Sequence, residues 1–212
     1  LAAADSCIKA IWCVPKYANP TGTTYSDNTV SALADLPNKA AAKDFVVLWD
    51  NAYAVHHLQQ PGDVLASIRD AAIAAGTHEH VVQFASTSKI TFAGAGVGFV
   101  ASGANVLKHL TAHLSVQTVG PDKVNQLRHA RFLNGRIAEH MAAHAEILRP
   151  KFALVERALT EQLGGLAIAQ WTRPNGGYFI SLDLLPGLAK QVVAMAKDAG
   201  LVLTPAGATF PN

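Results

Sequence analysis

Phe45-Val46-Val47-Leu48-Trp49-Asp50 is a run of five apolar residues that ends in a carboxylate. An unbroken apolar run of this length is typical of a strand in a parallel sheet whose two faces are both covered. The segments at residues 8–14 and 81–85 are also rich in apolar side chains, and a further strand is expected at 98–101. The chain therefore contains several candidate strands for one sheet.

Helical segments separate these strands. Ser26-Asp27 is a typical N-cap for a helix over residues 28–36, which Pro37 would end. A second helix is expected over 64–75, closed by Gly76. Alternating strands and helices predict an α/β fold with a mainly parallel sheet.

The second half of the chain has a different pattern. Proline is favoured at the first position of a helix, and we expect a long helix from Pro121 to about Leu148. The elements expected after it are a helix at 151–163, short strands at 167–171 and 178–182, and a helix at 188–199. We predict that residues 1–120 form part of a large α/β domain. Residues 121–212 would form an interdomain helix and part of a smaller α+β domain.

The composition narrows the functional class. The 212 residues are half apolar, with a mean hydropathy of +0.20, so the chain can bury a core. The net charge of +2 comes from 17 basic and 15 acidic residues without a basic cluster, which argues against nucleic acid as a partner. No apolar run is long enough to span a membrane, so no membrane partner is expected. Two cysteines, Cys7 and Cys13, indicate a reducing compartment without disulfides, and we predict a cytoplasmic protein.

The nine histidines are scattered along the chain. His56 and His57 are adjacent, whereas His140 and His144 fall four residues apart on an expected helix. Because no set of carboxylate or cysteine ligands accompanies either pair, we predict no metal site. The helical pair is interpreted as a polar helix face.

Three polar motifs follow the expected strands. Asn19-Pro20-Thr21-Gly22 comes after the first strand, Asp50 ends the second, and Ser86-Thr87-Ser88-Lys89 comes after the third. Ligands of open α/β sheets collect at the carboxyl ends of the strands. Each motif alone has an ordinary structural explanation, since Asp50 could cap a turn, Lys89 could be a solvated lysine and the serines could stabilise a turn. Their common placement favours a functional site.

The residue types indicate a particular chemistry. The amine of Lys89 can form a Schiff base with an aldehyde, and Asp50 can keep a proton on a heteroaromatic nitrogen. Tyr53 can donate a hydrogen bond to a ring hydroxyl, while Ser86 and Ser88 can bind phosphate oxygens. These are the requirements of pyridoxal 5'-phosphate (PLP) bound covalently to an enzyme.

The same segments resemble a known family. Asn19-Pro20-Thr21-Gly22, Asp50-Asn51-Ala52-Tyr53 and Ser86-Thr87-Ser88-Lys89 look like the signature of the class I, aspartate-aminotransferase-like branch of the fold-type I PLP enzymes. The runs at 50–58 and 89–97 are similar to a bacterial subgroup of aspartate aminotransferases. The resemblance extends to Gly176-Gly177-Tyr178-Phe179, which is similar to a small-domain strand whose aromatic residue approaches the substrate.

The resemblance implies roles for individual residues. Asn19 would contact both the cofactor hydroxyl and the substrate carboxylate. The peptide bond between Asn19 and Pro20 would be cis. Asp50 would pair with the pyridine nitrogen, Tyr53 with the ring oxygen, and Ser86 with the phosphate. Lys89 would hold PLP and move a proton between the substrate and the cofactor.

The resemblance also implies an activity and an assembly. It implies amino transfer between an amino acid and a 2-oxo acid, which we expect to be aspartate and 2-oxoglutarate. It also implies a homodimer. Many relatives carry a phosphate-binding arginine soon after the lysine, whereas residues 90–99 contain no Arg or Lys. The family arginine that binds the substrate carboxylate follows a segment like 203–207 and would lie beyond Asn212. The glycine-rich phosphate loop would lie before Leu1, and we expect this chain to be an interior piece of a longer polypeptide.

Other functions share these motifs. A PLP-dependent lyase on the same fold would need the same lysine, acid and hydroxyl groups. A regulator could combine a PLP-sensing domain of this kind with a basic helix-turn-helix outside the sequence. A catalytically inactive structural homologue is a third alternative.

Overall fold

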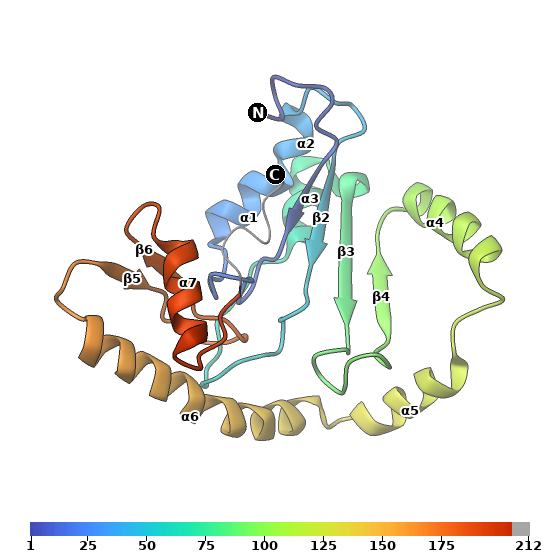
Figure 1. The fold of residues 1–212 in the computed structure, drawn as a ribbon. Helices are drawn as coiled ribbons and strands as arrows, with labels where there is room; N and C mark the ends of the chain where they lie inside the picture. The colour runs from blue at the N-terminus through green and yellow to red at the C-terminus, as the bar shows by residue number, and fades with distance from the viewer. Residues whose placement is uncertain (205–212) are drawn as a thin grey trace.

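A four-stranded sheet organises the first half of the chain in this computed structural model, which describes residues 1–204 (Figure 1). Its strands, in spatial order, are β1 (Ala10–Cys13), β2 (Val46–Asp50), β3 (Val81–Ser86) and β4 (Gly98–Ala101). The first three strands are parallel and β4 is antiparallel to β3. The predicted α/β fold with a mainly parallel sheet is confirmed.

The core lies between one face of this sheet and a layer of helices. The helices are α1 (Asp27–Ala34), α2 (Leu36–Lys39) and α3 (Ile68–Ala75), followed by the short 3-10 helix η1 (His78–His80). Alternate residues of the strands point into this layer, so Cys13, Val47 and Trp49 are buried with Val30 of α1 and Ile68 of α3. Burial of such side chains is the main stabilising contribution to the domain.

Local capping explains where these helices begin and end. The Ser26 hydroxyl accepts from the Thr29 amide and starts α1, as predicted. The Ser67 hydroxyl accepts from the Asp70 amide, so α3 begins at Ile68 and the expected start at residue 64 was wrong. Gly76 closes α3 in the left-handed conformation, with φ of 71°.

Two other boundaries in this region differ from expectation. The first helix ends at Ala34, and Pro37 belongs to the first turn of α2 instead of ending α1. Proline fits there because the first turn of a helix does not need its missing N–H. Only residues 10–13 of the expected strand at 8–14 are in β1, where they pair with β2.

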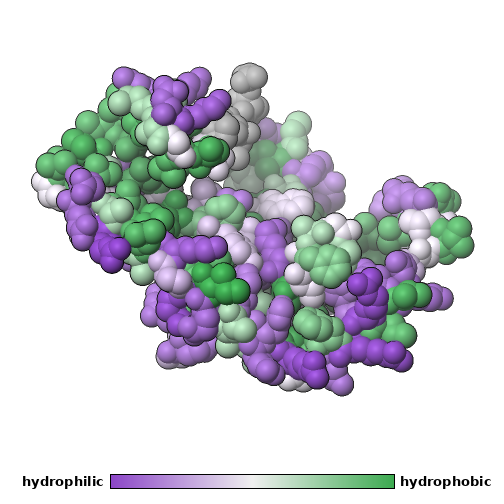
Figure 2. Space-filling model, turned by 60° about the horizontal axis from the view of Figure 1, so that its bottom comes forward, coloured by the Kyte–Doolittle hydropathy of each residue, from purple (hydrophilic) through white to green (hydrophobic). Residues whose placement is uncertain are grey.

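The second half of the chain contains longer helices and a small sheet. Its elements are α4 (Ala104–Gln117), α5 (Lys123–Leu133), α6 (Ile137–Leu163), β5 (Ala169–Trp171), β6 (Leu182–Leu184) and α7 (Ala189–Asp198). Strands β5 and β6 form an antiparallel pair. In Figure 1, α5 and α6 run along the edge of the molecule toward which β1, β2 and β3 point. Hydrophilic and hydrophobic side chains are mixed on this side of the surface (Figure 2).

The expected single helix over 121–148 was wrong. The chain breaks between α5 and α6 at Gly135, which has φ of 69°, a conformation that glycine adopts without a side-chain clash. Helix α6 then continues through Pro150 to Leu163, although a second helix was expected to begin at residue 151. The proline removes one helical hydrogen bond, but the adjacent Arg149 anchors α6 by donating from Nε to the Leu58 carbonyl at 2.8 Å.

The expected strand over 178–182 was also wrong, because β6 covers only Leu182–Leu184. The preceding residues pair with a different part of the chain. The Gly177 amide donates to the His56 carbonyl, and His57 forms an isolated antiparallel bridge with Gly176. These contacts hold the glycine pair against the loop that follows β2.

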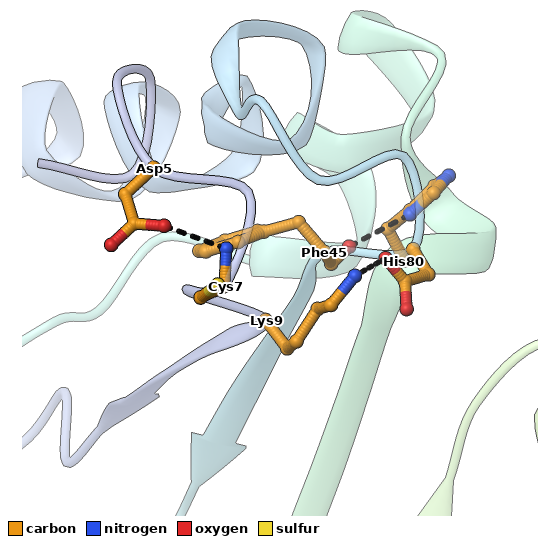
Figure 3. A network of polar contacts seen from close by, with 6 residues as sticks. Asp5, Cys7, Lys9, Phe45 and His80 are labelled. Carbon is orange, nitrogen blue, oxygen red and sulfur yellow. Dashed lines mark hydrogen bonds and ion pairs between the residues drawn. The ribbon is translucent and has the colours of Figure 1, made fainter.

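A polar network ties together the starts of the three parallel strands (Figure 3). Lys9, just before β1, pairs with Asp44 across 2.6 Å. His80, just before β3, contacts the carbonyl of Phe45 through Nδ1 at 2.8 Å. Figure 3 also shows Asp5 accepting from the Cys7 amide near the same edge. This edge is opposite to the one where the polar motifs lie.

Further features bear on the sequence predictions. Cys7 is exposed and Cys13 is buried, and both are free thiols. Burial raises the pKa of the Cys13 thiol to about 11. None of the helices within residues 1–204 combines the length and apolar character needed to cross a membrane.

Candidate active site

The candidate residues lie at the carboxyl edge of the parallel strands. Asp50 is the last residue of β2 and pairs in register with Phe84 of β3. Lys89 follows the end of β3 by three residues, and Asn19 lies in the loop after β1. The register therefore places all three motifs at one edge of the sheet, which faces α5 and α6 in Figure 1.

The Asp50 carboxylate is held by two donors. Its Oδ1 accepts from the Ala52 amide at 3.1 Å, and its Oδ2 accepts from Trp12 Nε1 at 3.3 Å. The Trp12 ring stacks on Phe84 with centroids 5.8 Å apart, so it reaches across β2 from the neighbouring strand. Sequence reasoning missed Trp12, because only the strand register shows that it lies one pleat away from Asp50.

Tyr53 connects Asp50 with Lys89. Lys89 Nζ lies 5.3 Å from the centre of the Tyr53 ring, close enough for a cation–π contact. Tyr53 is buried, and its burial raises the pKa of its hydroxyl, with a further increase from the negative charge of Asp50. The amine, the phenol and the carboxylate therefore belong to one cluster.

Ser86 and Ser88 form a second, adjoining group. Ser86 Oγ accepts from the Ser88 amide at 3.0 Å and donates to Ser88 Oγ at 2.9 Å. Gly96 packs against this turn so closely that an added Cβ would lie 2.2 Å from Ser88 Oγ and 2.7 Å from the Ser88 amide nitrogen. The Ser88 amide is used within the turn, and the two hydroxyl groups lie side by side where they can rotate to donate to an anion.

The backbone around Lys89 is held by side chains from distant segments. The Lys89 carbonyl accepts from His56 Nε2 at 3.0 Å and from the Tyr178 hydroxyl at 3.1 Å. The Ile90 carbonyl accepts from His140 Nε2 at 2.6 Å, and Tyr178 also contacts His144 Nε2 at 3.0 Å. The four-residue spacing of the two α6 histidines was visible in the sequence, but their targets were not.

Asn19 is placed differently from the other candidates. Its peptide bond to Pro20 is cis, as the resemblance implied, and its side chain is exposed. The loop packs on the later segment that carries Tyr178, since an added Cβ at Gly22 would lie 2.5 Å from Pro174 Cβ. The structure brings Asp50, Tyr53 and Lys89 together and pairs Ser86 with Ser88, whereas Asn19 lies on a separate neighbouring loop.

The available donors suit an aromatic aldehyde that carries a phosphate. An exposed lysine amine, a carboxylate at a strand end and a buried phenol lie beside paired hydroxyl groups. This combination can hold a pyridine ring, its hydroxyl and a phosphate, so the residues fit PLP. Within residues 1–204, no group of three or more His, Cys, Asp or Glu side chains is arranged to hold a metal ion. The segment at 203–207, expected to precede a carboxylate-binding arginine, lies mostly outside the described residues.

Comparison with known proteins decides the family. Residues 1–212 match the family described as aspartate amino-transferase. This chain belongs to the aspartate aminotransferase family. It is 44% identical over 206 residues to an aspartate aminotransferase of Corynebacterium glutamicum, covering 96% of this chain and 47% of the relative. It is 51% identical over 217 residues to a protein of Mycolicibacterium smegmatis, covering 100% of this chain and 49% of the relative. The chain therefore spans about half the length of these relatives.

Solved structures support the same placement. The crystal structure of an aspartate transaminase from Corynebacterium glutamicum matches with a TM-score of 0.91 and 44% identity, over 98% of this chain and 49% of that chain. An α-aminoadipate aminotransferase from Thermus thermophilus, complexed with N-(5'-phosphopyridoxyl)-L-leucine, matches with a TM-score of 0.77 over 92% of this chain and 49% of that chain. At 23% identity the second match shows the fold alone. The predicted fold, part of a fold-type I PLP-dependent transferase, is confirmed.

Proposed function

We propose that the full-length protein is a PLP-dependent aminotransferase. The observation that carries this proposal is the cluster at the carboxyl edge of the sheet, where Lys89 Nζ lies 5.3 Å from the Tyr53 ring and Asp50 ends the neighbouring strand β2. These groups supply an amine, an acid and a hydrogen-bond donor for one aromatic ring. The site residues predicted from the sequence are retained as this proposal.

The residues of this chain would have distinct roles. Bound PLP supplies an electron sink for the negative charge that develops at the substrate α-carbon. The Asp50 carboxylate keeps the ring nitrogen protonated, and the Tyr53 hydroxyl donates to the ring oxygen. The Lys89 amine carries the proton to and from the α-carbon. Asp50 stabilises the negative charge from the α-carbon only while that charge develops in the transition state. Asp50 therefore contributes more to the reaction rate than to cofactor binding.

The remaining candidates would orient the ligands. The hydroxyl groups of Ser86 and Ser88, with backbone N–H groups of their turn, donate to the phosphate. Since residues 90–99 contain no Arg or Lys, these neutral donors carry more of the phosphate binding, with a basic group from elsewhere in the chain or from a partner subunit. The Asn19 amide donates to the cofactor hydroxyl and to the substrate carboxylate.

The substrates and assembly are part of the same proposal. Aspartate is the proposed amino donor and 2-oxoglutarate the proposed acceptor, and family membership and the relative from Corynebacterium glutamicum support the donor. We propose a cytoplasmic homodimer in which residues 1–120 belong to the large domain and 121–212 to the interdomain helix and small domain. The apolar residues Leu107, Leu114 and Val116 are exposed on α4, which supports a covering partner or segment in the full-length protein.

The test uses full-length protein loaded with PLP. Visible absorbance should be present, and borohydride reduction should fix the cofactor to the peptide that contains Lys89, with no labelling in Lys89→Ala. Conversion of aspartate to its oxo acid should stop after a single turnover without 2-oxoglutarate and should continue when 2-oxoglutarate is supplied. Labelling of another lysine would refute the assignment of Lys89. Release of ammonia or sulfide without an acceptor would identify a lyase instead.

A further inference from the structure

The turn that carries Lys89 leaves two backbone carbonyl groups to be satisfied from outside. The Thr87 carbonyl accepts from the amides of Ile90 and Thr91, which closes one helical turn over these residues. The turn is not continued into a helix, so the next carbonyls lack the partners that a helix would provide. Backbone carbonyls in such positions need hydrogen bonds from side chains or water.

Side chains from three distant segments supply those hydrogen bonds. The Lys89 carbonyl accepts from His56, in the loop after β2, and from Tyr178, in the segment before β6. The Ile90 carbonyl accepts from His140 of α6. His144, one turn further along α6, contacts the Tyr178 hydroxyl. Two consecutive carbonyls are therefore fixed by parts of the chain that are separated by 33 to 89 residues.

These hydrogen bonds require particular protonation states. A carbonyl can only accept, so His56 Nε2 and His140 Nε2 must both carry hydrogen atoms. His56 is buried, and its Nδ1 is buried without a hydrogen-bond partner. A proton on Nδ1 would be costly there, which favours the neutral Nε2–H form. The His56 ring therefore donates its Nε2 hydrogen atom to the Lys89 carbonyl.

The lysine side chain itself is exposed, in contrast to its carbonyl. Its four-carbon stem can direct Nζ over a wide range, so the position of the backbone limits where the amine can reach. Productive attack needs the reacting atoms aligned, and a displacement of about 1 Å can cost on the order of a hundredfold in rate. Contacts that fix the lysine backbone can therefore act on covalent chemistry without touching the cofactor.

We propose that His140 and His56 are positioning residues that hold Lys89 for covalent attachment of PLP, in which the amine nitrogen would form a C=N bond to the aldehyde carbon and the aldehyde oxygen would leave as water. Helix α6 is linked to the lysine turn through His140. This inference rests on the proposed function. His140 bonds the backbone next to the lysine, so its removal shifts the amine while the groups that hold the ring and phosphate stay in place. The role predicts a loss in the attachment step that is separate from any loss in cofactor affinity.

The experiment compares two ligands of full-length apoprotein. Pyridoxamine phosphate lacks the aldehyde, so its dissociation constant measures the noncovalent site alone. The rate of covalent attachment of PLP is followed by stopped-flow absorbance, and the attached peptide is identified after borohydride reduction. The variants are His140→Ala, His140→Gln and His140→Asn, with His113→Ala as the control. His113 is exposed on α4, and its ring contacts His109 at 3.1 Å.

The expected pattern distinguishes a positioning role from a general structural one. Attachment should slow at least about tenfold in His140→Ala and His140→Asn. Gln should restore most of the rate, because its amide nitrogen can occupy the place of Nε2, whereas Asn is too short. Affinity for pyridoxamine phosphate should stay within about threefold in every variant, and His113→Ala should match the wild type. The Gln and Asn pair keeps the comparison informative if the alanine variant does not fold.

The outcomes are separable. Unchanged attachment rates in His140→Asn would overturn the positioning role while leaving the proposed function intact. Equal losses in attachment and in pyridoxamine phosphate affinity would also overturn it, because they would show only structural damage. A wild-type protein that labels a lysine other than Lys89 would refute the assignment of Lys89, and the inference with it, whereas a protein that binds neither PLP nor pyridoxamine phosphate would overturn the proposed function.

Discussion

At the scale of single residues, Asp50 is fixed before any ligand binds. Its two oxygen atoms accept from the Ala52 amide and from Trp12 Nε1. We expect Asp50→Ala to lower kcat by at least tenfold, or about 1.4 kcal/mol, and by as much as several kcal/mol, because a preorganised charge is lost where charge develops. PLP affinity should fall less. Asp183→Ala, at an exposed position of β6, serves as the control, and a loss in kcat below about tenfold for Asp50→Ala would contradict its role at the ring nitrogen.

Ser86 is the residue through which phosphate binding can be measured. Its hydroxyl lies 2.9 Å from Ser88 Oγ and 3.0 Å from the Ser88 amide nitrogen. Removing a hydrogen bond to a charged group typically costs about 1.5–3 kcal/mol, so Ser86→Ala should raise the PLP dissociation constant by roughly ten- to hundredfold. Equilibrium dialysis of the full-length protein measures this, with Ser115→Ala on the exposed face of α4 as the control. An unchanged constant would place the phosphate elsewhere.

The site residues that could be predicted are those whose positions follow from the nearby sequence. Asp50 and Lys89 could be found because Asp50 ends one apolar strand and Lys89 follows another by three residues, and parallel strands end at a common edge. Trp12 and His140 could not be found in this way. Their contacts with Asp50 and Ile90 depend on strand register and on the path of α6, which no local pattern specifies.

At the scale of elements, the turn after β3 depends on the glycine that faces it. An added Cβ at Gly96 would lie 2.2 Å from Ser88 Oγ and 2.8 Å from Ser88 Cα, so the serine turn must move. Gly96→Ala should destabilise the protein by about 1–3 kcal/mol and weaken PLP retention. Gly98→Ala, in β4, is the matched control because nothing lies within 4 Å of its added Cβ. Thermal unfolding and PLP binding of both variants would show whether the effect is specific to position 96.

Element boundaries show where local sequence signals decide and where they do not. Ser26 and Gly76 act as the caps that their residue types predict. Pro150 does not end α6, although it removes one helical hydrogen bond. The neighbouring Arg149 ties the helix to the Leu58 carbonyl at this point. The strand expected at 178–182 does not form. The glycines before it instead make backbone contacts with His56 and His57.

At the scale of the whole molecule, the site is assembled from both halves of the chain. The sheet contributes the lysine and the acid, while α6 and the Tyr178 segment hold the lysine backbone. The family and the fold followed from motifs in the sheet, whereas the histidine contacts between the halves required the tertiary structure. These contacts bury His56 and partly bury His144, so the stability of the chain becomes sensitive to pH.

Stability of the full-length protein should fall as the pH drops below the ordinary histidine range. Burial lowers the pKa of both His56 and His144 in the folded protein. Above about pH 6.5 these rings are neutral in both states and contribute no pH dependence. Below that value the unfolded chain takes up protons first, which favours unfolding until the pH reaches the folded pKa values. The slope from one such histidine is at most about 1.4 kcal/mol per pH unit. Urea unfolding between pH 8 and pH 5 should show this decline, and the slope should be smaller in His144→Gln than in the wild type. Stability that stays constant or rises between pH 6.5 and pH 5, or an equal slope in the two proteins, would show that these histidines are not what links folding to protonation.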